Sequence, residues 1–331
     1  RFPVGRASFP PVPHLTPDTW CPAGGGPAHV RAVGETVRME TRPTVRSVEP
    51  PSYRHVLVPL DGSRLSEAAL PVAEALAARF GAELVAVSVA APLYVEETRE
   101  LASARLDDAW KERLRVVEGH EVAPAIATLA DELGDTLLCL SSHGRGRVGG
   151  AVIGSIAREI LETTGAPVVA VGHGVQERFV DGDVRLFGTG RLVACVDGGP
   201  DSEQVLPHAA GWASALGLRL SVITVAEPIP PPMREDKPWH RHHGPDRDAD
   251  HYIEELRERW KPVAPDLTAT AVYDPIGPGR GLEAHLEGNP ADLVAVTTHA
   301  RSGLERVLLG AGAANIIQHS PVPVLVVPLE G

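Results

Sequence analysis

The stretch Leu137–Val171, LLCLSSHGRGRVGGAVIGSIAREILETTGAPVVAV, carries the clearest pattern in the chain. An apolar run ends at Ser141, a glycine-rich segment follows, and a helical pattern begins at Gly154-Ser155 and stops at Gly165 before a second apolar run. The pattern predicts a strand, a loop, a helix and a strand. Because glycine lets backbone N–H groups approach an anion and a helix start favours negative charge, this arrangement can hold a phosphate group.

The same pattern recurs 156 residues later in the chain. The ungapped matches are His143 with His299, Arg145 with Arg301, Gly154 with Gly310, Ile160 with Ile316 and Pro167-Val168 with Pro323-Val324. A second register, offset by 136 residues, relates Asp61-Gly62 to Asp197-Gly198. Two repeats of this size predict two similar domains. The difference between the two offsets places an insertion in the second repeat, at about Pro228–Tyr252.

The repeat divides the chain into a tail, two domains and a linker. Residues 1–52 are rich in proline and glycine and have no hydrophobic period, so we expect a disordered tail, with Met39 a candidate start of the native protein. Residues 53–173 and 191–331 are the two domains, and residues 174–190 join them.

Within each domain, apolar strands alternate with helices. This alternation predicts an open, mostly parallel α/β sheet with helices on both faces. In the first domain, one helix is expected over residues 66–81, and residues 101–117 are expected to form a helix leading into a short edge segment.

Composition and charge exclude several classes of protein. A formal net charge of −12 with only three lysines argues against a dedicated nucleic-acid binder. No apolar run is long enough for a membrane span and no secretory signal is recognisable, so we expect a cytoplasmic protein. Cys21, Cys139 and Cys195 are isolated and odd in number, which disfavours a disulfide framework or thiolate zinc site.

The histidines of the insertion (His240, His242, His243 and His251) are interpreted as part of a solvated loop, and no metal site is expected.

Charged residues near the glycine-rich segment suggest how a ligand is held. Arg145, Arg147 and Arg158 lie in and after this segment, where a guanidinium group can pair with phosphate oxygens, although solvated loop charges are the alternative. Asp61 ends the first strand and is expected beside the loop after the fourth strand, because ligands of open sheets lie at the carboxyl ends of the strands. Its carboxylate can read an adenine or ribose edge, and the alternative is a helix N-cap.

Together these motifs resemble the universal stress protein family in its tandem-domain form. The resemblance spans residues 53–331 and rests on a strand ending in DGS, on Ser66-Glu67 in the next helix, on SSHG followed by nine residues and GS, and on the last strand PVVAV. ATP-binding members carry Gly-x-x-Gly, nine residues and Gly-Ser/Thr. Here Ser141 stands at the first glycine, while Gly144, Gly154 and Ser155 match.

The resemblance implies a Rossmann-like fold and an adenine nucleotide ligand, ATP with or without Mg²⁺, in the first domain. The residues implied to flank adenine and ribose are Pro59, Leu60, Asp61 and Val89, with Ser141 near the ribose. Those implied to contact the phosphates are His143, Gly144, Arg145, Gly154, Ser155 and Ile156. It also implies that the domains pair through their last strands, PVVAV and PVLVV, either within one chain or in a homodimer.

The second domain departs further from the family motif. Ala300 and Ala311 replace a glycine and the hydroxyl residue, so we expect only the first domain to bind nucleotide well. The expected role is a nucleotide-dependent sensor or regulator in stress response, not an enzyme. One alternative is a scaffold that binds no nucleotide and works through protein partners. A remote alternative is an adenylating enzyme of the ATP pyrophosphatase type, because DGGPDS at residues 197–202 is similar to an SGGxDS loop, although the repeat aligns this stretch with DGSRLSE.

Overall fold

The computed structural model describes residues 48–142, 153–172, 175, 188–226, 249–300 and 307–329. The elements of the first half are β1 (His55–Pro59), α1 (Arg64–Glu67), α2 (Leu70–Phe80), β2 (Glu83–Ala90), η1 (Pro92–Tyr94), α3 (Val95–Ser103), α4 (Asp108–Arg113), β3 (Leu114–Glu118), α5 (Val122–Leu133), β4 (Thr136–Ser141), α6 (Ser155–Thr163) and β5 (Val168–Val171). Those of the second half are β6 (Arg191–Val196), α8 (Pro200–Glu203), α9 (Val205–Leu216), β7 (Arg219–Ala226), α11 (Ala249–Trp260), β8 (Thr268–Tyr273), α12 (Pro278–Gly288), β9 (Leu293–Thr297), β10 (His299–Ala300), β11 (Val307–Leu308), α13 (Ala311–His319) and β12 (Val324–Val327).

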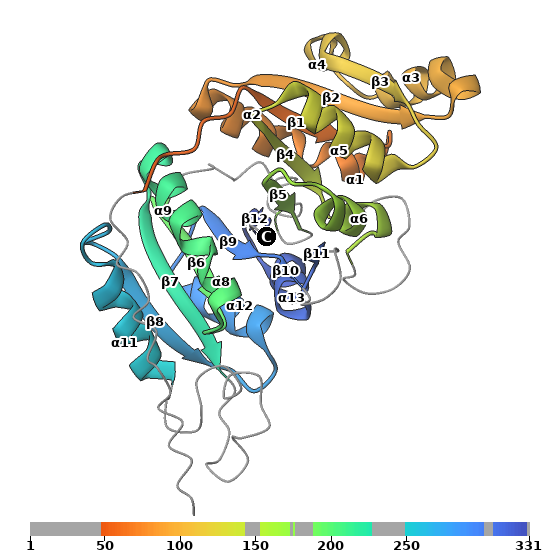
Figure 1. The fold of residues 1–331 in the computed structure, drawn as a ribbon. Coiled ribbons are helices and arrows are strands. Elements are labelled where there is room, and N and C mark those ends of the chain that lie inside the picture. Colours follow the sequence, from red (N-terminus) through yellow and green to blue (C-terminus); the bar gives the residue numbers. More distant parts are fainter. Residues whose placement is uncertain are drawn as a thin grey trace, which may run out of the picture. The chain divides into compact units, whose positions relative to one another are not determined.

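The main sheet has ten strands in the order β3-β2-β1-β4-β5-β12-β9-β6-β7-β8 (Figure 1). Neighbouring strands are parallel within each half. Between the halves β5 and β12 pair antiparallel, with Val169 opposite Leu325. The predicted open, mostly parallel α/β sheet is therefore confirmed, and the last strands of the two repeats pair within one chain.

A second, two-stranded sheet was not predicted from the sequence. It consists of β10 and β11, which run antiparallel with His299 opposite Leu308. This small sheet leads directly into Leu309 and Gly310, at the start of α13.

Residues 66–81 were predicted to form one helix, but the structure divides them between α1 and α2, so the prediction of a continuous helix was wrong. Ala68 N and Ala69 N donate to carbonyls three residues back, and α2 begins at Leu70. The break occurs because Pro71 has no N–H with which to continue the helical hydrogen bonds. Residues 101–117 are likewise divided, because the carboxylate of Asp107 caps a new helix by accepting from Trp110 N at 2.9 Å.

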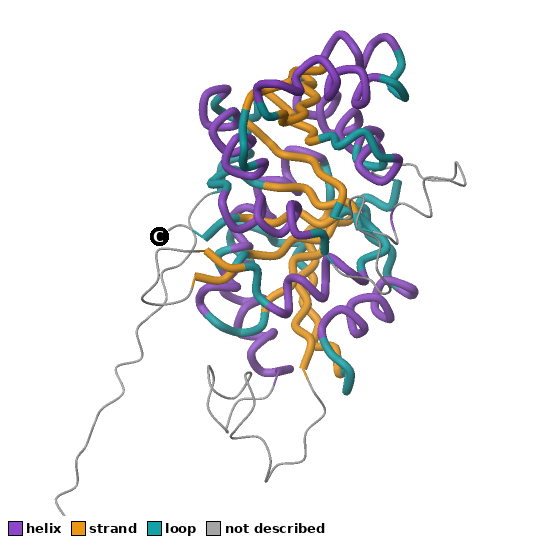
Figure 2. Tube along the Cα trace, turned by 90° about the vertical axis from the view of Figure 1, so that its right-hand side faces the viewer, coloured by secondary structure: helices purple, strands orange, loops and turns teal. Residues whose placement is uncertain are grey.

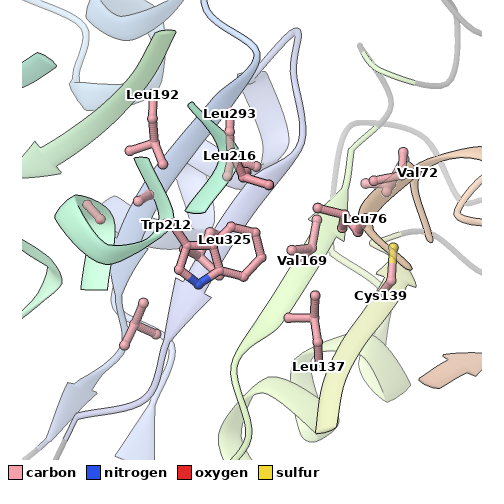
Figure 3. Close-up of a cluster of buried hydrophobic side chains, with 14 of the residues drawn as sticks. Val72, Leu76, Leu137, Cys139, Val169, Leu192, Trp212, Leu216, Leu293 and Leu325 are labelled. Atoms are coloured by element: carbon pink, nitrogen blue, oxygen red, sulfur yellow. The ribbon is translucent and has the colours of Figure 1, made fainter. Parts of the chain in front are cut away.

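Two hydrophobic clusters lie on the two faces of the sheet. Along β1, Val56 and Val58 belong to one cluster and Leu57 to the other, because successive side chains of a strand point to opposite faces. Figure 2 shows the strands flanked by helices. In the first cluster, Leu137 and Val169 of the first half and Leu325 of the second belong to one group of buried side chains (Figure 3). Each of the two clusters thus contains side chains of both halves.

Three aromatic rings connect the halves further. Tyr53 and Phe80 of the first half pack on Trp212 of α9, with ring centroids 5.7 and 5.0 Å from that of the indole. Trp212 Nε1 donates a hydrogen bond to the Tyr53 hydroxyl at 3.0 Å. Burial raises the pKa of Tyr53 to about 12, and the hydrogen bond from Trp212 partly offsets this increase.

The last residues of the proline-rich tail lie against α9. A Cβ atom at Gly211, in the middle of that helix, would be 2.7 Å from the carbonyl oxygen of Glu49. Residues 1–47, most of the linker and residues 227–248 of the insertion lie outside the described residues. In the described part of the chain, no helix has the length and hydrophobicity needed to cross a bilayer.

Candidate functional site

The candidate site lies at the carboxyl ends of three adjacent strands. β1 lies between β2 and β4, so the ends of these strands meet at one edge of the sheet. Asp61 is two residues beyond the end of β1, Val89 is near the end of β2, and Ser141 ends β4. Pro59 is half-buried at the end of β1, and Leu60 beyond it is buried. The structure therefore brings the predicted residues of these strands to one edge, where α/β sheets bind ligands.

Asp61 closes a tight turn between β1 and α1. Its Oδ1 accepts a hydrogen bond from Ser63 N at 2.9 Å. Gly62 between them has φ +75°, a left-handed conformation that favours glycine. The N-cap of α1 is Ser63, whose Oγ accepts from Ser66 N at 3.2 Å. The alternative interpretation of Asp61 as the N-cap is therefore wrong, and its exposed carboxylate precedes the capping residue Ser63 by two positions.

Two serines that the sequence did not mark as site residues hold this backbone. Ser66 Oγ accepts from Asp61 N at 3.3 Å and donates to Ser63 O at 2.9 Å. Ser88 Oγ donates to Leu60 O at 2.8 Å. The sequence did mark Ser66 as a residue that both repeats keep, because it recurs in the second repeat as Ser202. These bonds fix the position of the Leu60–Asp61 backbone beside the sheet.

The start of α6 lies at the end of β4. Gly154 caps the helix, and its N–H donates to Ser142 O at 2.8 Å. Glycine at the N-cap has no side chain, and within the described residues no side-chain cap hydrogen bond is made to the N–H groups of the first turn of α6. Ser155 and Ile156 in this turn are exposed, and Ile156 is 43% exposed. A helix start of this kind can bind an anion through its backbone.

The central part of the predicted phosphate loop lies outside the described residues. This applies to His143, Gly144 and Arg145, and also to Arg147. The remaining arginine, Arg158, is described, and its Nη1 lies 3.7 Å from Glu162 Oε1. Ser141, which replaces the first glycine of the motif, is 9% exposed and lies opposite Val171 in the sheet. Its hydroxyl therefore lies in a largely buried position.

The second half repeats the same turn with different neighbours. Asp197 Oδ1 accepts from Gly199 N at 2.9 Å, Asp197 N donates to Ser202 Oγ at 3.1 Å, and Gly198 has φ +84°. The DGGPDS stretch thus has the geometry of the first turn. At the end of β6, Cys195 replaces Pro59, and burial raises the pKa of its thiol to about 12.

Of the four histidines of the insertion, the structure describes His251 alone. His240, His242 and His243 lie outside the described residues, and His251 Nε2 lies 3.2 Å from Glu255 Oε1 on the same helix. Within the described ranges there is no group of three or more histidine, cysteine or acidic side chains arranged for a metal ion.

The sequence pattern of one family matches both halves of the chain. The model of the universal stress protein family matches residues 52–172 and 188–328. The chain belongs to the universal stress protein family. The resemblance inferred from the motifs, including its tandem form, is confirmed.

Known relatives agree with this membership. A universal stress protein of Mycolicibacterium smegmatis is 25% identical over 304 residues, which cover 82% of this chain and 96% of the relative. One from Mycobacterium tuberculosis H37Rv is 31% identical over 134 residues, or 36% of this chain and 45% of the relative.

Solved structures of other proteins show the same fold. The crystal structure of one from Archaeoglobus fulgidus aligns with a TM-score of 0.56 and 18% identity over 83% of this chain and 98% of that chain. A functionally unknown protein from Pseudomonas aeruginosa aligns with a TM-score of 0.55 and 16% identity over 84% and 93%. At these identities the likeness concerns the fold alone.

Proposed function

We propose that the first half binds ATP or a related adenine nucleotide, and that the protein acts in stress response as a nucleotide-dependent sensor or regulator. The observation that supports this most is the glycine-capped start of α6, which the Gly154–Ser142 hydrogen bond holds at the carboxyl end of β4. Backbone donors at a fixed helix start favour a phosphate group.

The adenosine part is assigned to the neighbouring strand ends. Pro59, Leu60, Asp61 and Val89 are at or near the ends of β1 and β2. Ser66 Oγ accepts from Asp61 N and Ser88 Oγ donates to Leu60 O, and these bonds hold the Leu60–Asp61 backbone in place before any ligand arrives, which lowers the entropy lost on binding. The exposed Asp61 carboxylate is able to accept hydrogen bonds from ribose hydroxyl groups.

The phosphates are assigned to the start of α6. Gly154, Ser155 and Ile156 supply backbone N–H groups there, and Ser155 adds a hydroxyl. His143, Gly144 and Arg145 complete the proposed phosphate contacts, as the family motif implies. Any Mg²⁺ is proposed to enter with the nucleotide, bound mainly to its phosphates.

We propose a binding role and no enzymatic one. Burial raises the thiol pKa of Cys139 and of Cys195, and the thiolate is the nucleophilic form. These thiols are therefore poor nucleophiles. We also assign the nucleotide to the first half alone, because Ala311 lacks the hydroxyl that Ser155 offers at the same position of the repeat.

The test is to heat-denature freshly purified protein and identify released nucleotide by chromatography and mass. Gly154 has φ −58° and ψ 148°, a conformation that any residue adopts, so Gly154→Val adds a side chain at the helix start without backbone strain. Gly310→Val makes the same change at α13 and serves as the matched control. We expect close to one adenine nucleotide per chain from the wild type and from Gly310→Val, and none from Gly154→Val.

Two outcomes contradict the proposal in different ways. Equal release from both variants places the nucleotide elsewhere. If the wild type releases none and calorimetry detects no uptake of ATP with Mg²⁺, the protein is better explained as a scaffold acting through protein partners.

A further inference from the structure

A side chain of helix α6 accepts a hydrogen bond from a backbone amide of the second half. Leu309 N donates to Glu162 Oε1 at 3.3 Å, and β11 lies beside α6. Leu309 is buried, at 5% exposure, and directly precedes Gly310, the cap of α13. The helix proposed to hold phosphate in the first half therefore reaches the start of the equivalent helix in the second.

The same carboxylate oxygen faces a positive charge. Glu162 Oε1 lies 3.7 Å from Arg158 Nη1, and their side chains are 24% and 43% exposed. One oxygen thus interacts with both a guanidinium group and the backbone amide of Leu309. Arg158 is the fourth residue of α6, and its N–H donates to Gly154 O at 2.9 Å. Its backbone is therefore within one helical turn of the proposed phosphate position, and its side chain is long enough to turn toward either end of the helix.

The second repeat has no equivalent of this ion pair. At the 156-residue offset, Ala314 and Gln318 stand where Arg158 and Glu162 stand in α6. Both helices nevertheless begin at a glycine cap and lie against the same sheet face. The charges are therefore not required by the fold that the repeats share.

We propose that Glu162 is a positioning residue that couples anion binding at the start of α6 to Leu309. This rests on the proposed function, since the anion is the phosphate of the bound nucleotide. An anion at the helix start attracts the Arg158 guanidinium away from Glu162. Glu162 Oε1 then loses its competing cation and accepts the Leu309 N–H more strongly. Nucleotide binding in the first half thereby tightens the start of α13 in the second.

The coupling has a reciprocal consequence for affinity. Because two coupled equilibria influence each other equally, weakening the attraction between Glu162 and Arg158 frees the guanidinium for the anion. An ion pair this exposed contributes little in water, so Glu162→Gln is expected to bind ATP about two- to fivefold more tightly than the wild type.

The direct readout is hydrogen exchange of the Leu309 amide in the full chain. Addition of ATP with Mg²⁺ is expected to slow this exchange at least about twofold in the wild type, and inorganic tripolyphosphate is expected to do the same. Arg158→Ala should show slow exchange with or without ATP, because the competing cation is gone. Glu162→Ala should show fast exchange under both conditions, because the acceptor is gone.

Two further variants separate this role from a general effect of charge. Glu159→Gln removes an exposed negative charge from the same helix, and its ATP response at Leu309 should match the wild type. Glu162→Gln keeps an acceptor oxygen and should restore protection of the Leu309 amide relative to Glu162→Ala. An effect of Glu159→Gln equal to that of Glu162→Gln, or no rescue by glutamine, overturns the proposal.

Failure of the coupling is distinguishable from failure of nucleotide binding. If calorimetry shows ATP binding while Leu309 exchange stays unchanged, the coupling is wrong and the proposed function stands. If calorimetry shows no binding, the proposed function is wrong. The role of Glu162 is then tested by hydrogen exchange in the ligand-free protein. Arg158→Ala must then slow Leu309 exchange relative to the wild type, and unchanged exchange overturns the role of Glu162.

Discussion

Asp292 offers a stability test whose magnitude follows from the structure. It directly precedes β9 and is 5% exposed. Its carboxylate accepts three backbone hydrogen bonds: Oδ1 from Thr189 N at 2.9 Å, and Oδ2 from Gly190 N at 2.7 Å and Arg191 N at 3.2 Å. One buried side chain therefore anchors the end of the linker and the first residue of β6.

Asp292→Asn keeps the shape of the side chain but turns one acceptor into a donor. At least one backbone N–H then faces an NH₂ group, and the other bonds lose their charge assistance. A hydrogen bond to a charged group contributes about 1.5–3 kcal/mol, so the total loss is expected to be about 2–4 kcal/mol. For a chain of this size, that corresponds to a decrease in the apparent Tm of about 4–8 °C.

The assay is thermal unfolding followed by circular dichroism. Asp266→Asn is the matched control, because Asp266 is exposed and should change the unfolding free energy by less than about 0.5 kcal/mol. A decrease in Tm for Asp292→Asn no larger than for Asp266→Asn would refute the reasoning, since it would mean that the three amides do not depend on the carboxylate.

Three other predictions concern buried groups. Burial raises the pKa of Tyr53 from 10.0 to about 12, so this hydroxyl ionises in the unfolded chain before it does so in the folded protein as the pH rises. The free energy of unfolding measured in urea should therefore fall by up to about 3 kcal/mol between pH 10 and 12. Tyr53→Phe should lack this fall. Iodoacetamide at pH 8 should leave Cys139 and Cys195 unmodified in the folded protein and label both in urea, as peptide mass spectrometry will show. Gly211→Ala should destabilise the protein by about 1–2 kcal/mol in urea unfolding, because its Cβ meets a backbone oxygen at 2.7 Å, whereas Gly288→Ala, which meets no atom within 4 Å, should be neutral or stabilising.

The strands were predictable from the sequence because of how they are buried. Runs such as Leu137–Leu140 are apolar at every position, as strands covered on both faces must be. The helix break before Pro71 was not predicted, because proline is also favourable in the first turn of a helix. The strands at His299 and Val307 have two residues each, and so short a segment carries no periodicity to detect.

The candidate site was predictable in its position but not in its local contacts. The Asp-Gly-Ser sequence placed Asp61 at a strand end, yet both Asp61 and Ser63 are suitable caps, and only the folded turn shows that Ser63 has this role. Glu162 was missed because its partner, Leu309, is 147 residues away and contributes a backbone N–H, which any residue except proline carries. The contrast with Gln318 was the one available signal.

The antiparallel pairing of β5 with β12 has a genetic consequence. When two identical subunits associate through such strands, a single codon change alters both subunits at once. Here each partner strand is encoded separately on one gene. A mutation can therefore modify one half while the other keeps its original chemistry. One half can therefore keep a hydroxyl at Ser155 while the other acquires Ala311, without an intermediate in which both halves lack the hydroxyl.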